Sequence, residues 1–460
     1  MSRGLVGELV RLGWPVLIAQ LAVMANNVID TIMAGRYGTL DLAAVGIGSS
    51  IYFSVFVALM GVLLALTPIV AHMYGAGQHA EIGEELRQSV WLAVALTLVS
   101  VGLFAFPEPF LDVARVEPAL EAKVRAYLHA LAWSLPASLL FRVFYSFSTA
   151  ISRPRTVMAL TLIGLALKVP LNWVFMYGNL GAPELGSTGC AVATTLIAWI
   201  TCVLAWAWCW FEPGYQPYRV FARWSWPNAK ALGRILSLGL PIGLTFFIDV
   251  TGFTFMALFI ARLGALYSAA HQIASNLAAL AFMLPLALGN AASVVVGQSL
   301  GARQPARARA AGIIGLALAL ACAAVSGAGL YVFADGIAGL YAGDAELRRV
   351  AAGLIAFVAV YHLFDAVQAV TVNVLRGYKR AVVPMLVYAV ALWGVGLGGG
   401  YLIGLSSVDV AWLGLATPMG APGFWLAAIA SLVLASSVIT AYFLRVSRVA
   451  TASAASSSRR

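Results

Sequence analysis

The sequence predicts an all-α polytopic membrane protein with twelve transmembrane helices. Of its 460 residues, 62% are hydrophobic and only 10% are charged, whereas soluble proteins carry about 25% charged residues. Apolar runs of about 20 residues, the length that crosses a bilayer as a helix, recur between charged or Pro/Gly-rich segments. These runs show no sustained alternation of apolar and polar residues, so the strands of a membrane barrel are excluded.

The predicted spans follow one another along almost the whole chain. Prolines in or beside several of them, such as Pro136 and Pro384, are expected to bend helices. The spans cover about residues 12–34, 43–71, 88–110, 126–150, 156–178, 188–211, 232–260, 266–297, 310–334, 350–374, 381–404 and 422–444.

The distribution of Lys and Arg predicts that both termini lie in the cytoplasm. In this orientation the inner segments carry 19 of these residues and the outer loops carry 7. Cytoplasmic loops of membrane proteins are enriched in Lys and Arg. The net charge of +10 is thus a topology signal, and the lipid bilayer rather than nucleic acid is the expected partner.

Three sequence matches at one offset of 226 residues indicate an internal duplication. We therefore predict a first lobe of six helices over 1–215 and a second over 232–445. A cytoplasmic linker over 216–231 joins them, and a disordered cytoplasmic tail occupies 446–460. Because six is even, the copies are parallel repeats, as in one class of secondary transporters. The matches pair "LGWPVLIAQL" (12–21) with "LGLPIGLTFF" (238–247), "LAAVGI" (42–47) with "SAAHQI" (268–273), and "YGAGQ" (74–78) with "LGARQ" (300–304).

Three acids lie deep in predicted spans: Asp30, Asp249 and Asp365. A charge in the bilayer centre costs about 2.5–3.5 kcal/mol on insertion scales, so such residues mark ion or substrate pathways by default. None of the three has an acidic counterpart in the other lobe, which favours function over scaffold. A buried carboxylate that exchanges a proton for a cation is the physical basis of antiport. The aligned residues are Met256, Val23 and Leu139, respectively.

Other polar residues within the spans have two interpretations. Lys168 and Arg142 are the only bases there, so at least one of the three acids is expected to lack a basic partner. Tyr361 lies four residues before Asp365, on the same helical face, and either helps to hold a cation or is an interface aromatic. Polar side chains such as Asn172 and Gln272 either line a pathway or join helices by hydrogen bonds.

The motifs resemble those of the multidrug and toxic compound extrusion (MATE) family, in its bacterial NorM-type branch. They are "VIDTIMAGRYG", "LGLPIG", "KVPLNWVF" and "LRGYKR", combined with the duplicated six-helix plan, over about residues 8 to 445. The resemblance implies two lobes in a V shape around a large central cavity, in the bacterial inner membrane. It also implies export of lipophilic cationic drugs and dyes in exchange for Na⁺ or H⁺.

The resemblance also implies roles for single residues. Asp249 stands where relatives commonly have glutamate, which keeps the charge but shortens the side chain by one methylene. Asp249 and Asp365 are candidates for a Na⁺ site. The implied coupling residues are Asp249, Asp365, Tyr361 and Asp30, and the implied substrate-cavity residues are Asp30, Asn172, Gln272 and Asp344, the last near the external mouth.

Two other functions compete with this interpretation. A lipid-linked oligosaccharide flippase of the same superfamily would need several bases to hold a pyrophosphate, and the spans hold only two. An integral membrane enzyme would need a catalytic or metal motif, and we find neither H-E-x-x-H, nor a P-loop, nor a nucleophile elbow. We therefore expect a transporter without enzymatic activity or cofactor, which works as a monomer.

Overall fold

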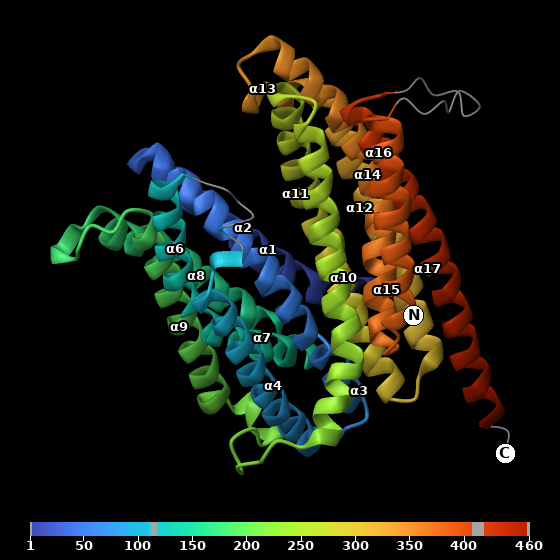
Figure 1. Ribbon diagram of the computed structural model, residues 1–460. Coiled ribbons are helices and arrows are strands. Elements are labelled where there is room, and N and C mark those ends of the chain that lie inside the picture. Colours follow the sequence, from blue (N-terminus) through green and yellow to red (C-terminus); the bar gives the residue numbers. More distant parts are fainter. Residues whose placement is uncertain (1, 110, 112–116, 407–417, 458–460) are drawn as a thin grey trace. The chain divides into compact units, whose positions relative to one another are not determined.

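The computed structural model describes residues 2–109, 111, 117–406 and 418–457. Over these ranges every regular element is a helix (Figure 1). Eleven helices are long and apolar enough to cross a membrane, or up to twelve if a bent pair counts as one span, within the same ranges. The all-α class and the number of spans predicted from the sequence are confirmed.

Two compact units divide the chain. One consists of Ile18–Gly243, and the other of Met1–Leu17 together with Leu244–Arg460. Both divisions fall inside long helices, so α1 (Ser2–Tyr37) and α10 (Ala229–Ala261) each contribute to both units. The lobe boundaries predicted from the repeat, at 215 and 232, stay a prediction.

The unit Ile18–Gly243 is built from the helices between α1 and α10. The sharpest bend lies between α6 and α7, which meet at 45°, with Pro136 in the first turn of α7. Proline is tolerated there because the first turn has no intrahelical donor to lose. The elements are α2 (Thr39–Leu63), α3 (Leu66–Gly75), α4 (His79–Ala105), α6 (Pro118–Ala132), α7 (Leu135–Ala150), α8 (Pro154–Tyr177), η1 (Asn179–Gly181), α9 (Ser187–Phe211) and η2 (Pro213–Tyr218).

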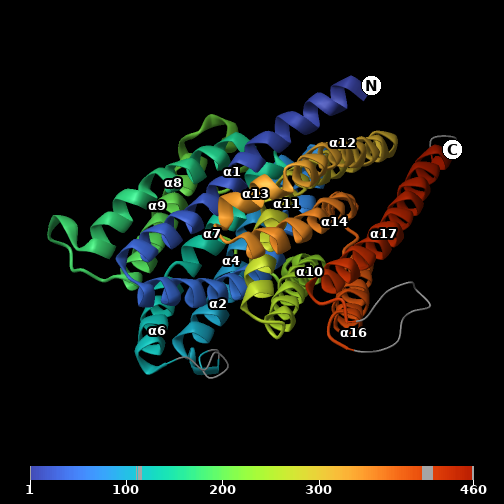
Figure 2. The ribbon, with the colours of Figure 1, turned by 90° about the horizontal axis from the view of Figure 1, so that it is seen from above.

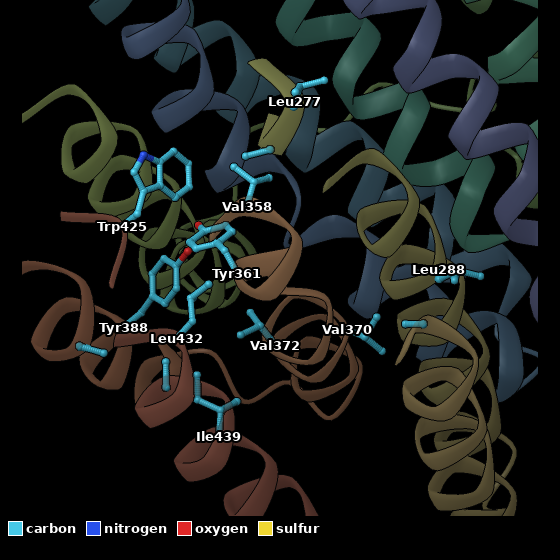
Figure 3. Close-up of a cluster of buried hydrophobic side chains, with 14 of the residues drawn as sticks. Leu277, Leu288, Val358, Tyr361, Val370, Val372, Tyr388, Trp425, Leu432 and Ile439 are labelled. Atoms are coloured by element: carbon cyan, nitrogen blue, oxygen red, sulfur yellow. The ribbon is translucent and has the colours of Figure 1, made fainter. Parts of the chain in front are cut away.

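The second unit packs its helices around α14, which contacts α11, α12 and α17. Figure 2 shows α12, α14 and α17 as neighbouring rods. Buried side chains such as Val370 and Ile439 fill the space among these helices (Figure 3). The elements are α11 (Ala265–Gly301), α12 (Pro305–Val332), α13 (Ala334–Tyr341), α14 (Ala345–Gly377), α15 (Val382–Ala389), η3 (Val390–Gly398), α16 (Gly399–Gly404) and α17 (Ala421–Ser457).

Helix α17 differs from the sequence prediction at its end. It continues to Ser457, through most of the segment 446–460 that we predicted to be disordered; residues 458–460 lie outside the described part. Alanine has the highest helix propensity, and extending an existing helix by one residue is easier than starting a new one. The small residues of the tail therefore continue the membrane helix.

One span of the second unit is interrupted by a π-helical segment. Val382–Gly404 is long and apolar enough to cross the membrane, and its middle part, η3, is π-helical. The sequence of η3 contains three of the glycines in the run "GVGLGGGYLIG". Single π-helical turns are rare and occur frequently at functional sites. This segment therefore directs attention to the side chains around it.

Close contact between α10 and α2 depends on glycine. A Cβ atom added at Gly239 would meet the carbonyl oxygen of Val62, whereas one added at Gly233, six residues earlier on α10, would meet nothing within 4 Å. We expect Gly239→Ala to destabilise the protein by about 1–3 kcal/mol, because the backbones must separate. Gly233→Ala should be neutral or stabilising by up to about 1 kcal/mol, because alanine favours helix.

Thermal unfolding of the two purified variants in detergent measures this difference. Equal unfolding temperatures for Gly239→Ala and Gly233→Ala would contradict the close approach of α10 to α2.

Candidate functional site

Two of the three predicted membrane acids lie in the same unit. Asp249 on α10 is partly buried, and Asp365 on α14 is buried. The carboxylates are near enough for Asp249 to act electrostatically on Asp365. Two like charges in an apolar environment repel each other strongly because little water screens them. The fold thus brings together the two residues that the sequence proposed for a cation site.

Asp249 has a hydrogen-bond partner that the sequence analysis did not identify. The hydroxyl of Tyr388, on α15, donates to Asp249 Oδ1 over 2.8 Å. Just beyond it, the Trp393 Nε1–H in η3 donates to the carbonyl oxygen of Ile248 over 3.3 Å. These bonds join the span that contains the π-helical segment to α10 beside the acid.

Asp365 has no such support. In the described part of the chain, no hydrogen bond or ion pair reaches its carboxylate. Tyr361 lies one turn earlier on α14, as predicted, and its ring packs edge-on against Phe253 at 6.2 Å and Trp425 at 5.6 Å between ring centroids. Figure 3 shows Tyr361, Tyr388 and Trp425 gathered from three different helices. Aromatic side chains therefore enclose the acid pair, and a base does not.

Two ring nitrogens near this aromatic cluster also lack partners. Nε1 of Trp425 and Nδ1 of His271 are buried without a hydrogen bond to any described residue, and the two rings lie 5.8 Å apart. The other nitrogen of His271, Nε2, shares a hydrogen bond of 3.3 Å with Ser275. Buried polar atoms normally have a protein or water partner. The surroundings of the acids thus offer further groups for water or ions.

Tyr388 gives a testable consequence of this geometry. We expect Tyr388→Phe to lower the free energy of unfolding by about 1–3 kcal/mol, because Asp249 loses its donor in a largely apolar site. Tyr378→Phe is the matched control, since the buried hydroxyl of Tyr378 has no hydrogen-bond partner among the described residues, and it should change stability by less than about 0.5 kcal/mol. Thermal unfolding in detergent tests both variants, and equal effects would contradict the assigned bond.

A signal for Tyr388 was present in the sequence. At the repeat offset of 226, Tyr388 aligns with Leu162, so this hydroxyl is specific to one copy, like the three acids. The same criterion that selected Asp30, Asp249 and Asp365 would have selected Tyr388 if it had been applied to tyrosines. Its bond with Asp249, however, joins residues 139 positions apart, and no local pattern predicts that.

Asp30 lies in the other unit and has a strong partner. Lys168 Nζ on α8 lies 2.8 Å from Asp30 Oδ1, and the amide nitrogen of Asn172 donates to the same oxygen over 2.8 Å. Lys168 is 1% exposed and Asp30 is 7% exposed. Lys168 and Asn172 are four residues apart on one helical face, which places both against the same carboxylate. Of the two basic partners considered, the structure pairs Asp30 with Lys168.

The remaining predicted residues have other surroundings. Gln272 is exposed on α11, with no hydrogen bond to a described residue. Asp344 caps the N-terminus of α14, where its side chain accepts from the backbone N–H of Leu347 over 2.8 Å, a common role for aspartate. Arg142 lies over the ring of Tyr145, 4.3 Å from its centroid, and forms no ion pair in the described structure. The geometry does not join Gln272 or Asp344 to the acid sites.

The two acid sites differ in kind. Asp30 has a counter-ion within the chain, whereas Asp249 and Asp365 have only a tyrosine donor between them. Within the described ranges, no group of three or more His, Cys, Asp or Glu side chains is arranged to hold a metal ion. The carboxylate and hydroxyl oxygens of Asp249, Asp365, Tyr361 and Tyr388 suit a proton or a small hard cation.

Comparison with known proteins places this architecture. The family model described as MatE matches twice, over residues 15–174 and 241–402, and the two matches begin 226 residues apart, at the repeat offset. The probable multidrug resistance protein NorM of Aromatoleum aromaticum is 42% identical over 447 residues, covering 96% of this chain and 94% of that protein. The multidrug resistance protein NorM of Aliivibrio fischeri is 37% identical over 442 residues, covering 96% and 95%.

A solved structure shows the same fold. The crystal structure of the Vibrio cholerae MATE transporter VcmN in its bent form matches with a TM-score of 0.83 at 19% identity, covering 98% of each chain. The family model covers more than half of this chain, and the relatives match nearly its whole length. The chain is a multi-pass membrane protein that belongs to the MatE family.

Proposed function

We propose that this protein is a secondary active multidrug efflux transporter that exchanges lipophilic cations for Na⁺ or H⁺. The observation that carries the proposal is the Asp249–Asp365 pair: two acids in one largely apolar site, with a tyrosine donor and no basic partner in the described structure. Two neighbouring carboxylates cannot both stay ionised there at low cost unless a proton or another cation neutralises them. The names of the relatives as multidrug resistance proteins support export of drugs.

Coupling then follows from the difference between two conformations. The ion is held by Asp249 and Asp365 with the help of Tyr361 and Tyr388, and it favours the conformation from which the drug has left. A bound drug favours the other conformation. Exchange requires that the ion and the drug each bind the two conformations with different affinities, because otherwise neither shifts the equilibrium. The monomer in the bacterial inner membrane is the proposed transport unit.

The structure gives Asp30 a different part in this scheme. Because Lys168 already compensates its charge, Asp30 is available to a proton or a cationic drug only when that ion pair opens. A cation that competes with the Lys168 ammonium group would couple its own binding to a rearrangement of α1 against α8. We propose this opening as the route by which Asp30 takes part in transport.

Efflux from proteoliposomes tests the proposal. The purified protein is inserted into vesicles loaded with ethidium, and a Na⁺ gradient and a pH gradient are imposed in separate experiments. Efflux driven by one gradient supports antiport and names the ion. If verified insertion gives no efflux under either gradient, the proposal for cationic drugs is wrong.

A further inference from the structure

The segment between α9 and α10 is held rigidly, although it contains few helical residues. It follows Phe211 and ends at Ala229, where α10 begins. The Arg87 guanidinium on α4 donates to the carbonyl oxygens of Arg219 (3.0 Å) and Val220 (2.9 Å) and to the Ser225 hydroxyl (2.9 Å). This segment is therefore a fixed surface rather than a free tether.

Further bonds fix the second half of the same segment. Trp91 Nε1–H donates to the carbonyl oxygen of Ser225, and the Gln88 amide donates to that of Trp226, both over 2.9 Å. A Cβ atom added at Gly83 would meet the carbonyl oxygens of Tyr218 and Arg219. The absence of a side chain at Gly83 thus lets the segment lie directly on α4.

The fixed backbone nevertheless presents large aromatic side chains outward. Trp224 is 71% exposed and Trp226 is 76% exposed. Each packs only partly against Trp91, with ring centroids 5.5 Å and 6.4 Å away. They lie between the spans Ser187–Phe211 and Ala229–Ala261, at the depth where a bilayer changes from hydrocarbon to headgroups. Tryptophan is enriched at this boundary because its ring is apolar and its N–H is polar.

Arginines on this surface also face outward, and their acidic partners hold them there. The Arg223 side chain is 70% exposed and its partner Glu84 is 32% exposed. The Arg234 side chain is 64% exposed and its partner Glu85 is 4% exposed. Arg219 is exposed and forms no side-chain hydrogen bond or ion pair with a described residue. Guanidinium groups positioned in this way keep donors free for phosphate.

We propose that the side chains of Arg219, Arg223, Trp224 and Trp226 form a docking surface for anionic phospholipid headgroups of the leaflet on which the segment lies. The arginines bind the headgroup phosphate and its net negative charge. The tryptophans occupy the boundary region beneath it. By the predicted orientation this is the cytoplasmic leaflet, whose anionic lipids attract basic segments next to the membrane.

Native mass spectrometry of the full chain in detergent tests the proposal. The protein is titrated with phosphatidylglycerol or with phosphatidylcholine, and the bound lipid is counted. Arg219→Gln with Arg223→Gln should weaken retention of phosphatidylglycerol by on the order of tenfold, at roughly fivefold for each arginine, and should leave phosphatidylcholine unchanged. The matched control, Arg36→Gln with Arg262→Gln, removes the same charge from exposed positions elsewhere and should change both by less than about twofold.

Equal losses in the two double variants would overturn the proposal, because retention would then follow total charge. Equal binding of the two lipids by the unmodified protein would overturn it as well. If the Arg223 change unfolds the protein, Arg219→Gln alone remains informative, with a roughly fivefold loss expected. Trp224→Ala with Trp226→Ala should weaken both lipids, since an indole at the boundary does not read headgroup charge; unchanged retention of both would overturn the part assigned to the tryptophans.

Discussion

Asp365→Asn is expected to abolish ion-driven efflux of ethidium, lowering its rate by roughly a hundredfold if one charge-assisted contact with the ion is lost. Asparagine keeps the size and shape of the side chain but cannot bind a proton at physiological pH and offers no net charge to Na⁺. The carboxylate is buried and has no hydrogen bond or ion pair within the described structure. The substitution therefore removes the charge and breaks no identified contact.

Asp335→Asn is the matched control for this experiment. Asp335 lies in the same unit and pairs with Arg348 Nε over 2.9 Å at an exposed position, where an ion pair contributes about 0–1 kcal/mol. Its efflux rate should equal that of the unmodified protein. Equilibrium binding of ethidium to Asp365→Asn in detergent separates a coupling defect from a loss of fold. Full efflux by Asp365→Asn would mean that the coupling site lies elsewhere.

Lys168→Met is expected to give the largest loss of stability, about 3–5 kcal/mol, because it leaves the Asp30 carboxylate buried without its counter-ion. Methionine fills a similar volume, so packing changes little. The double variant Asp30→Asn with Lys168→Met removes both charges and should recover most of this loss, since replacing a whole buried pair is often neutral. Thermal unfolding of the purified variants in detergent provides the measurement.

The control for the lysine is Lys230→Met, which removes the same group at an exposed position on α10. It should change the free energy of unfolding by less than about 0.5 kcal/mol. If Lys168→Met is no less stable than Lys230→Met, Asp30 stands in water rather than in an ion pair. The double-variant cycle also reports the strength of the Asp30–Lys168 interaction directly.

These two experiments address the difference between the acid sites. Asp30 and Lys168 form a neutral pair, whose disruption costs stability. Asp249 and Asp365 share one Tyr388 hydroxyl, so the stability of this site depends on a cation from solution. A site that needs an external cation responds to an ion gradient, whereas a site with an internal counter-ion responds only when its pair opens. The structure therefore favours Asp249 and Asp365 for coupling.

Most of the fold could be predicted from the sequence because its signals are local. A span needs about 20 apolar residues in succession, and a reader can find such a run without knowing its neighbours. The repeat offset of 226 residues likewise needs only the letters, and the two matches of the family model begin at that offset. The end of α17 was predicted wrongly as disordered, because the preceding helix determines the conformation of the small residues that follow it.

The sequence by itself determined the class of this protein, the number and limits of its spans, and the three acids that lie in the membrane. Only the tertiary structure decided the partners of those acids: Lys168 and Asn172 for Asp30, and Tyr388 for Asp249. The physical reason is range. Hydrophobic transfer into the bilayer acts on each segment separately, whereas a hydrogen bond or an ion pair forms between atoms about 3 Å apart, and the packing of distant helices brings those atoms together.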